Sequence, residues 1–188
     1  MNMKPVKPIE TKYKGYRFRS RLEARWAVFF DDLGIKYEYE LEGFKLPSGA
    51  AYLPDFYLSE LCLHVEVKPS ERIALPDLKK IAEFSLQGDH PLLLIVGTPT
   101  QEEMFLIDRR HDPGIEEIEV NQEAPNDDET VSIAFESLRD WCSVQFGTTP
   151  FSQDRVLLYK SLPPSDEHAL QQALLKGKQA RFEFGESG

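Results

Sequence analysis

The sequence predicts an α/β protein built on a mixed central β-sheet flanked by helices. Three observations support this fold class: a helical pattern of apolar residues at 20–34, three strand-like segments directly after it, and a second helical pattern at 75–87 that leads into the wholly apolar run 91–97. A strand without polar residues must be covered on both faces, so helices are expected on both sides of the sheet. The predicted order of elements is αβββαβ.

The two helices carry recognisable start and stop signals. The first begins at Ser20, a good N-cap residue, and ends at Gly34. Its apolar residues recur at helical spacing: Leu22, Trp26, Phe29, Phe30 and Leu33. The second has Pro76 in its first turn, where a missing backbone N–H costs nothing. Both helices are therefore predicted to be amphipathic and to pack one face on the sheet.

The three segments between the helices are predicted to form a strand meander. Residues 36–41, 51–58 and 61–68 are rich in Tyr, Phe, Val and Leu, and turn-forming residues separate the first two. Because successive side chains of a strand point to opposite faces, Glu66 and Lys68 should lie side by side on the third strand.

The second half of the chain gives weaker signals. Residues 104–108 are predicted as a fifth strand, and 111–130 as an acidic loop. Residues 131–146 are expected to begin as a strand and continue as a helix, 156–160 to form a strand, and 165–180 to form a terminal helix.

The length of 188 residues and the apolar fraction of 41% indicate one domain with an extension. We expect a basic lead at 1–14, a core at 15–110 and a C-terminal extension at 111–188 packed on the core. The two cysteines, Cys62 and Cys142, are too few and too far apart for a disulfide framework or a zinc finger, and we expect buried thiols. No apolar stretch is long enough to span a membrane, so a cytoplasmic protein is expected.

Charge is distributed unevenly along the chain. The net charge of −10 argues against a general affinity for nucleic acid. However, residues 1–30 hold eight basic side chains against two acidic ones, whereas residues 101–140 hold thirteen acidic against three basic. The N-terminal part is therefore suited to phosphates, and the acidic segment 101–130 is a candidate contact for a basic protein partner.

A candidate metal site lies on the second and third predicted strands. Asp55 on one strand and Glu66 with Lys68 on the next can converge, because neighbouring strands place their side chains close together. Two carboxylates, with a backbone carbonyl such as that of Val67 and several waters, suit Mg²⁺ or Mn²⁺. The alternative is an exposed Glu66–Lys68 pair with Asp55 as a turn residue after Pro54. The apolar flanks argue for the site, since an unpaired buried charge is costly.

These residues resemble the motif of the PD-(D/E)XK nuclease superfamily: Pro54-Asp55, then Glu66-Val67-Lys68 at a strand end. The predicted order of elements is similar to the restriction-endonuclease-like core of that superfamily. Small uncharacterised phage and bacterial proteins of this kind share three phrases with the chain, which read FRSRLEARWA at 18–27, YLPDF at 52–56 and ARFEFG at 180–185.

The resemblance also suggests further site residues. In TnsA-like and Holliday-junction-resolvase-like members a glutamate of the first helix completes the metal site, and Glu23 has the matching place. Glu23 is equally the last residue of an S-x-x-E capping box begun by Ser20; both roles stay open, and we favour the ligand. His64 shares the face of Glu66, and we expect it to be packed in place. Basic residues near the site are expected to contact nucleic-acid phosphates: Arg17, Arg19, Arg21, Arg25 and Lys79.

Together these features predict a Mg²⁺-dependent DNA endonuclease that hydrolyses phosphodiester bonds with a metal-activated water. The resemblance implies DNA as the partner, a 5′-phosphate product and, in many small members, a homodimer on duplex DNA. Two alternatives stay open. One is a catalytically silent nuclease fold that acts as a binding or assembly module, and the other is an acidic inhibitor of a DNA-binding protein.

Overall fold

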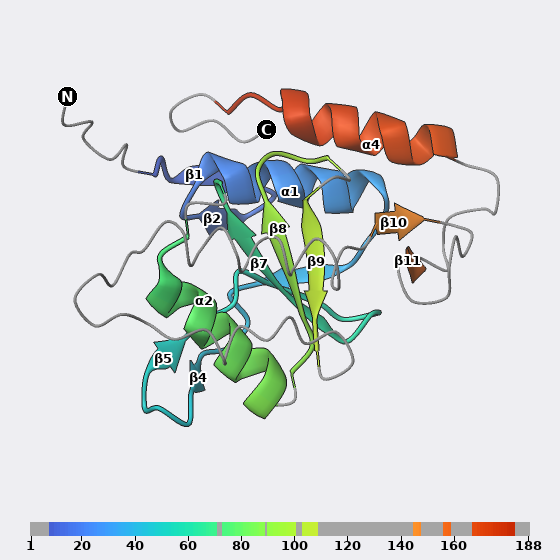
Figure 1. Cartoon of the computed structure of the whole chain (residues 1–188). Coiled ribbons are helices and arrows are strands. Elements are labelled where there is room, and N and C mark those ends of the chain that lie inside the picture. The colour runs from blue at the N-terminus through green and yellow to red at the C-terminus, as the bar shows by residue number, and fades with distance from the viewer. Residues whose placement is uncertain are drawn as a thin grey trace, which may run out of the picture.

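The computed structural model describes residues 8–70, 73–88, 90–100, 103–108, 145–147, 156–158 and 167–182. Its centre is a five-stranded sheet in the order β3-β6-β7-β8-β9 (Figure 1). β7 and β8 run parallel, and the other neighbouring pairs are antiparallel. The predicted mixed sheet with helices is therefore confirmed, and the five strands are β3 (Tyr37–Tyr39), β6 (Phe56–Leu58), β7 (Leu63–Lys68), β8 (Leu92–Val96) and β9 (Met104–Ile107).

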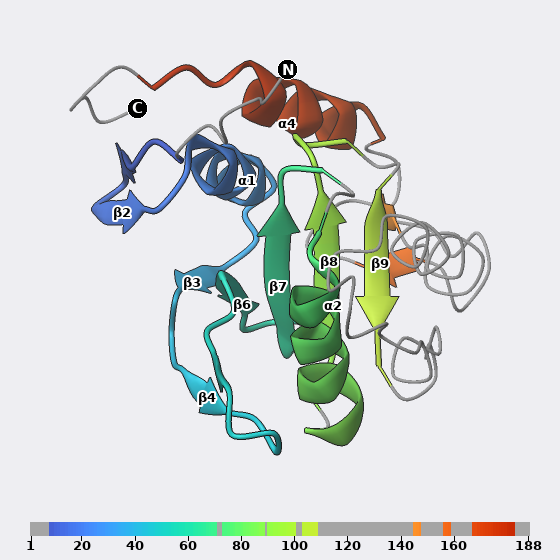
Figure 2. The same ribbon diagram turned by 60° about the vertical axis from the view of Figure 1, so that its left-hand side comes forward.

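Two apolar clusters lie on opposite faces of the sheet. Helix α1 (Arg21–Asp32) packs Trp26, Phe29 and Phe30 against Val65 of β7 on one face. Helix α2 (Leu75–Ala82), continued by the π-helical turn η1 (Glu83–Gln87), covers the other face, where its apolar residues meet Leu92, Leu94 and Val96 of β8. Figure 2 shows α2 lying across β8, well apart from α1 near the end of β7. The helix predicted over 75–87 is thus present, with a change of winding after Ala82.

The segment predicted as one strand over 51–58 is two short strands, which corrects the expected meander. β5 (Ala51–Tyr52) pairs with β4 (Phe44–Lys45) in a separate two-stranded ribbon, and β6 starts only at Phe56. Pro54 lies in the break, and proline cannot donate a backbone hydrogen bond to a strand ladder. The break bends the chain, so the ribbon extends away from the sheet (Figure 2).

Part of the expected basic lead is a β-hairpin. β1 (Thr11–Tyr13) and β2 (Tyr16–Phe18) are antiparallel, and the turn between them holds Lys14 and Gly15 at φ of 44° and 86°. Two positive φ angles in a two-residue loop are typical of a type I′ hairpin turn. Tyr13 and Phe18 are buried in the cluster around α1.

The C-terminal helix α4 (Glu167–Gln179) packs along α1 (Figure 1). This helix agrees with the one predicted over 165–180. β10 (Gln145–Gly147) and β11 (Val156–Leu158) form a parallel pair, so the end of the helix expected over 131–146 is wrong, whereas the strand expected at 156–160 is present. The acidic loop at 111–130 and most of 131–146 lie outside the described residues.

Cys62 is exposed at a φ of 50°, so the expected burial of this thiol is wrong. Among the described residues, no helix has the length and apolar character that crossing a membrane requires.

Candidate active site

Strand register brings Asp55 and Glu66 together. Phe56 of β6 pairs with Val65 of β7, and continuing this antiparallel register by one position sets Asp55 opposite Glu66. Residues that face each other across two antiparallel strands point to the same face of the sheet. Asp55 itself lies in the bend before β6 and not within a strand as predicted, but the convergence of the two carboxylates follows from the register all the same.

The backbone of β7 fixes the Asp55 carboxylate. Asp55 Oδ2 accepts a hydrogen bond from the Val67 backbone N–H at 2.8 Å. The β6 ladder ends at Val65, so this side chain takes the place of a strand partner. Asp55 is only 7% exposed, and burial together with the nearby charges of Glu66 and Glu23 raises its pKa well above the ordinary value. A cation beside this carboxylate would relieve both effects.

Glu66 is held by two neighbours. Its Oε1 forms an ion pair with Lys68 Nζ at 2.6 Å, and its Oε2 accepts a hydrogen bond from the Tyr52 hydroxyl at 3.0 Å. Burial opposes the charge of Lys68, but Glu66 and then Asp55 outweigh it, so that the pKa of Lys68 is raised. Glu66 and Lys68 therefore lie on one face of β7, as strand alternation predicts. Tyr52 was missed, although it stands three residues before Asp55 in the YLPDF phrase.

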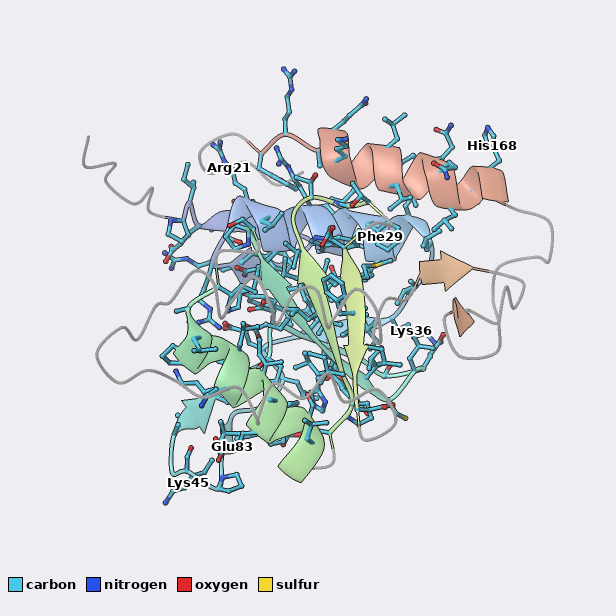
Figure 3. The ribbon with its side chains drawn as sticks, in the orientation of Figure 1. Arg21, Phe29, Lys36, Lys45, Glu83 and His168 are labelled. Carbon is cyan, nitrogen blue, oxygen red and sulfur yellow. The ribbon has the colours of Figure 1, made fainter. Side chains whose placement is uncertain are left out.

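A cavity of about 1120 Å³ surrounds these groups. It lies between the first turn of α1, the β4–β5 ribbon and α2. Figure 3 shows Arg21 at the start of α1 and Lys45 on the ribbon. Ionisable side chains from all of these elements line it: Arg19, Arg21, Glu23, Lys45, Asp55, Glu66, Lys68, Asp77 and Lys80.

The expected phosphate contacts divide into two groups. Arg19, whose guanidinium is paired with Glu40, and Arg21 line the cavity. Outside the cavity lining, the guanidinium of Arg17 is paired with exposed Glu10 and Arg25 Nε donates to the carbonyl of Ala180 at 3.3 Å. Arg25 thus ties α1 to the segment after α4. Nothing in the spacing of these arginines distinguishes the two groups.

On α2 the cavity is lined by Lys80 and Asp77, and the expected contact Lys79 is not among its lining residues. Lys80 Nζ donates to Asp77 Oδ1 at 3.3 Å, which holds both side chains on that side of the helix. The D-x-x-K spacing is the signal that could have identified this pair, because residues three apart lie next to each other on a helix.

Glu23 has the hydrogen bonds of a helix cap. Its Oε1 accepts from the Ser20 hydroxyl at 2.6 Å, and its Oε2 accepts from the Tyr39 hydroxyl at 2.6 Å and from the Arg19 backbone N–H at 3.1 Å. The Ser20 Oγ in turn accepts from the Glu23 backbone N–H at 3.2 Å. This is a variant of the capping box in which the N–H of residue 19 takes the place of that of residue 20. Glu23 also lines the cavity, so its role as a metal ligand stays a prediction.

The donor set fits a hard divalent cation with most of its water shell. Asp55 and Glu66 supply carboxylate oxygens from two adjacent chain segments, and Mg²⁺ is often bound by one or two carboxylates together with substrate phosphates. No cluster of three His, Cys, Asp or Glu side chains placed to hold a metal occurs within the described residues. The Asp55–Glu66 pair is therefore the part of the predicted ligand set that the fold brings together. A ligand role for the Val67 carbonyl stays a prediction.

His64 lies on the same face of β7 as Glu66 but outside the cavity lining. Its ring packs against Phe44, Tyr57, Phe84 and His90, with centroid distances of 4.9 to 5.6 Å. Burial and the neighbouring His90 lower the pKa of His64 to about 4. His64 is thus packed in the core, as predicted.

Comparison of the chain with protein-family models, curated proteins and solved structures finds no match.

Proposed function

We propose that the chain is a divalent-metal-dependent DNA endonuclease with a restriction-endonuclease-like core of the PD-(D/E)XK kind. One observation carries the proposal: the buried carboxylates of Asp55 and Glu66, with Lys68 ion-paired to Glu66, line a cavity. Several other basic side chains line the same cavity. Two buried negative charges side by side are costly unless a cation offsets them. Such a pair in the wall of a cavity therefore indicates a functional site.

Asp55 and Glu66 are the residues that would hold Mg²⁺ or Mn²⁺. When bound, such an ion lowers the pKa of a coordinated water and neutralises charge on the phosphodiester. Asp55 keeps its orientation through the N–H of Val67, and Glu66 through the hydroxyl of Tyr52. Neither carboxylate therefore needs to reorganise when the substrate arrives.

Lys68 is the group that acts on the reacting atoms. Its ammonium bears three N–H donors, of which one is engaged with Glu66 and others can orient the attacking water or a phosphate oxygen. In the proposed hydrolysis the water oxygen forms a bond to phosphorus and the P–O3′ bond breaks. The water proton passes to solvent, the leaving 3′ oxygen takes up a proton, and the product carries a 5′-phosphate.

A cleavage assay tests the proposal. Supercoiled plasmid and single-stranded and branched DNA would be incubated with the protein in Mg²⁺ or Mn²⁺, with EDTA as the metal-free control. Asp55→Asn and Lys68→Met are expected to lose activity by about 100-fold or more, because each removes a group at the reacting centre. Glu38→Gln, on strand β3, serves as the matched control for a lost carboxylate and should keep full activity.

The outcomes separate this function from the alternatives. Absence of metal-dependent cleavage on every substrate, or unchanged cleavage by both site variants, would reject the nuclease. DNA binding without cleavage would instead favour a silent binding module.

A further inference from the structure

The two carboxylates of the proposed site are deep in the cavity wall. Asp55 and Glu66 are 7% and 6% exposed, so a phosphate can reach them only by entering the cavity. A volume of about 1120 Å³ is slightly above the range of about 300–1,000 Å³ that holds drug-sized ligands. The part of a ligand that enters this space can therefore be a few nucleotides of one strand.

The walls of the cavity are largely apolar. Besides the ionisable groups, Ile9, Leu22, Phe44, Ala51 and Leu53 line it. A duplex presents its phosphates to a protein and hides the faces of its bases. An unpaired strand exposes both, and proteins that bind single strands combine basic side chains along the backbone with aromatic side chains on which the bases stack. The combination of basic and apolar side chains in this cavity therefore suits an unpaired strand better than a duplex.

Cations stand on both sides of the carboxylate pair. Arg19 and Arg21 belong to the entry into α1, whereas Lys45 is on the β4–β5 ribbon and Lys80 on α2. Figure 3 shows Arg21 at the start of α1 and Lys45 on the ribbon. These basic side chains line the same cavity as Asp55, Glu66 and Lys68.

We propose that the cavity binds an unpaired segment of DNA, with its phosphates along these cations and its bases against the apolar wall. The substrate class of the proposed nuclease is then single-stranded DNA, in the form of overhangs, flaps or displaced strands, and not continuous duplex. The statement about cleavage rests on the proposed function, whereas the statement about strand binding does not.

Binding is measured by fluorescence anisotropy with a labelled oligonucleotide, alone or annealed to its complement. The Asp55→Asn protein is used so that no strand is cut. We expect the single strand to bind about tenfold more tightly or better, since stacking of one base on an aromatic side chain contributes on the order of 1–3 kcal/mol and Phe44 lines the cavity. Equal or tighter binding of the duplex would overturn the inference.

Two adjacent lysines of α2 provide a matched pair of variants. Lys80→Ala and Lys79→Ala remove the same charge from the same helix, but only Lys80 lines the cavity. In the same Asp55→Asn background, Lys80→Ala should weaken single-strand binding about three- to tenfold and Lys79→Ala should change it by less than about twofold. Equal effects of both substitutions would overturn the proposed path. Circular dichroism of both variants establishes that the fold is retained.

Cleavage of labelled substrates by the wild-type chain in Mg²⁺ completes the test. Preferential cutting of single strands and overhangs supports the inference, whereas efficient cutting within continuous duplex overturns it and leaves the nuclease function standing. No cleavage of any substrate, with the binding preference intact, rejects the nuclease and supports the strand-binding cavity. The two proposals can therefore fail separately.

Discussion

Asp55 shows how one side chain can serve both the fold and the proposed chemistry. Its Oδ2 takes the Val67 N–H that would lack a strand partner, and a buried N–H without a partner is costly. The charge on the same carboxylate is unfavourable, since burial and Glu66 raise its pKa. The hydrogen bond and the charge can therefore be separated by experiment.

Asp55→Asn should make the metal-free protein more stable at neutral pH. The amide oxygen can still accept from Val67, and the buried negative charge is lost. We expect the melting temperature in EDTA to rise, with each kcal/mol worth about 2–4 °C in a chain of this size. Differential scanning calorimetry of both proteins measures this. A lower melting temperature for the variant at pH 7 would contradict the assignment of Asp55 as an electrostatically strained group.

The pH dependence of this difference has a defined sign. The pKa of Asp55 in the folded state is raised above its ordinary value of 3.8. The contribution of protonated Asp55 to the stability of the wild-type protein is therefore fully present below pH 3.8. It is lost as the pH rises through the raised folded pKa. The advantage of the variant should therefore be small near pH 4 and grow toward neutral pH.

Tyr52 is a positioning residue for Glu66. The hydroxyl is buried and its pKa is raised well above the ordinary value by burial and by Glu66, so it stays a hydrogen-bond donor throughout the accessible pH range. Tyr52→Phe should weaken Mn²⁺ binding about 10-fold or more, as loss of a partner behind a metal ligand commonly does. Titration calorimetry measures the affinity, and Tyr57→Phe on β6, the next strand along the chain, is the control. Unchanged affinity in Tyr52→Phe would exclude this role.

At the scale of elements, the first turn of α1 is the point where cap and site meet. Ser20→Ala removes the N-cap and should cost about 1 kcal/mol of unfolding free energy. Glu23→Gln loses the charge that accepts from Tyr39, Ser20 and Arg19 and should also destabilise the protein. If Glu23 is only a cap, the Mn²⁺ affinity of Glu23→Gln should stay within about threefold of wild type. If Glu23 is a metal ligand, the variant should lose far more affinity. Denaturant unfolding and calorimetric titration of both variants separate the two roles.

The contact between α4 and α1 depends on Gly177. A Cβ at this position would lie 2.9 Å from the Arg25 carbonyl oxygen and 2.9 Å from Pro99 Cγ. Alanine is a better helix former than glycine by about 1 kcal/mol, so Gly177→Ala would stabilise an exposed helix. Here we expect a net loss of about 1–2 kcal/mol, because one of the two clashes is with backbone. Chemical denaturation compares Gly177→Ala with Lys178→Ala, a substitution at the exposed neighbouring position. A stabilised Gly177→Ala protein would contradict the close packing of α4 against α1.

At the scale of the whole molecule, the basic side chains of the cavity form a local group in a chain that is acidic overall. The net charge is −10, yet the cavity gathers Arg19, Arg21, Lys45, Lys68 and Lys80. DNA binding should therefore depend on a few phosphate contacts and not on a general basic surface.

This predicts a shallow dependence of affinity on salt. Three or four phosphate contacts on a single strand correspond to a slope of log K against log salt of about −2 to −3. Anisotropy titrations of the Asp55→Asn protein from low to moderate NaCl measure the slope, and Lys80→Ala should reduce its magnitude by about 0.7. A slope near zero would mean that phosphates do not contribute to binding.

Much of the fold follows from local sequence patterns. The start of α1 at Ser20, the apolar strand β8 and the common face of Glu66 and Lys68 were predicted, because helical periodicity and strand alternation are set by the backbone itself. The hairpin at β1–β2 was missed although Lys14-Gly15 is a plausible turn, since its strands are only three residues long.

Tertiary structure decided how the site is assembled. The sequence by itself determined that Asp55, Glu66 and Lys68 lie on adjacent segments, with Pro54 beside them. Only the fold decided that Pro54 breaks the strand, that Tyr52 on the resulting ribbon reaches Glu66, and that Lys80 and not Lys79 faces the cavity. Such contacts join residues far apart in the chain, and their geometry depends on how whole elements pack, which no local pattern encodes.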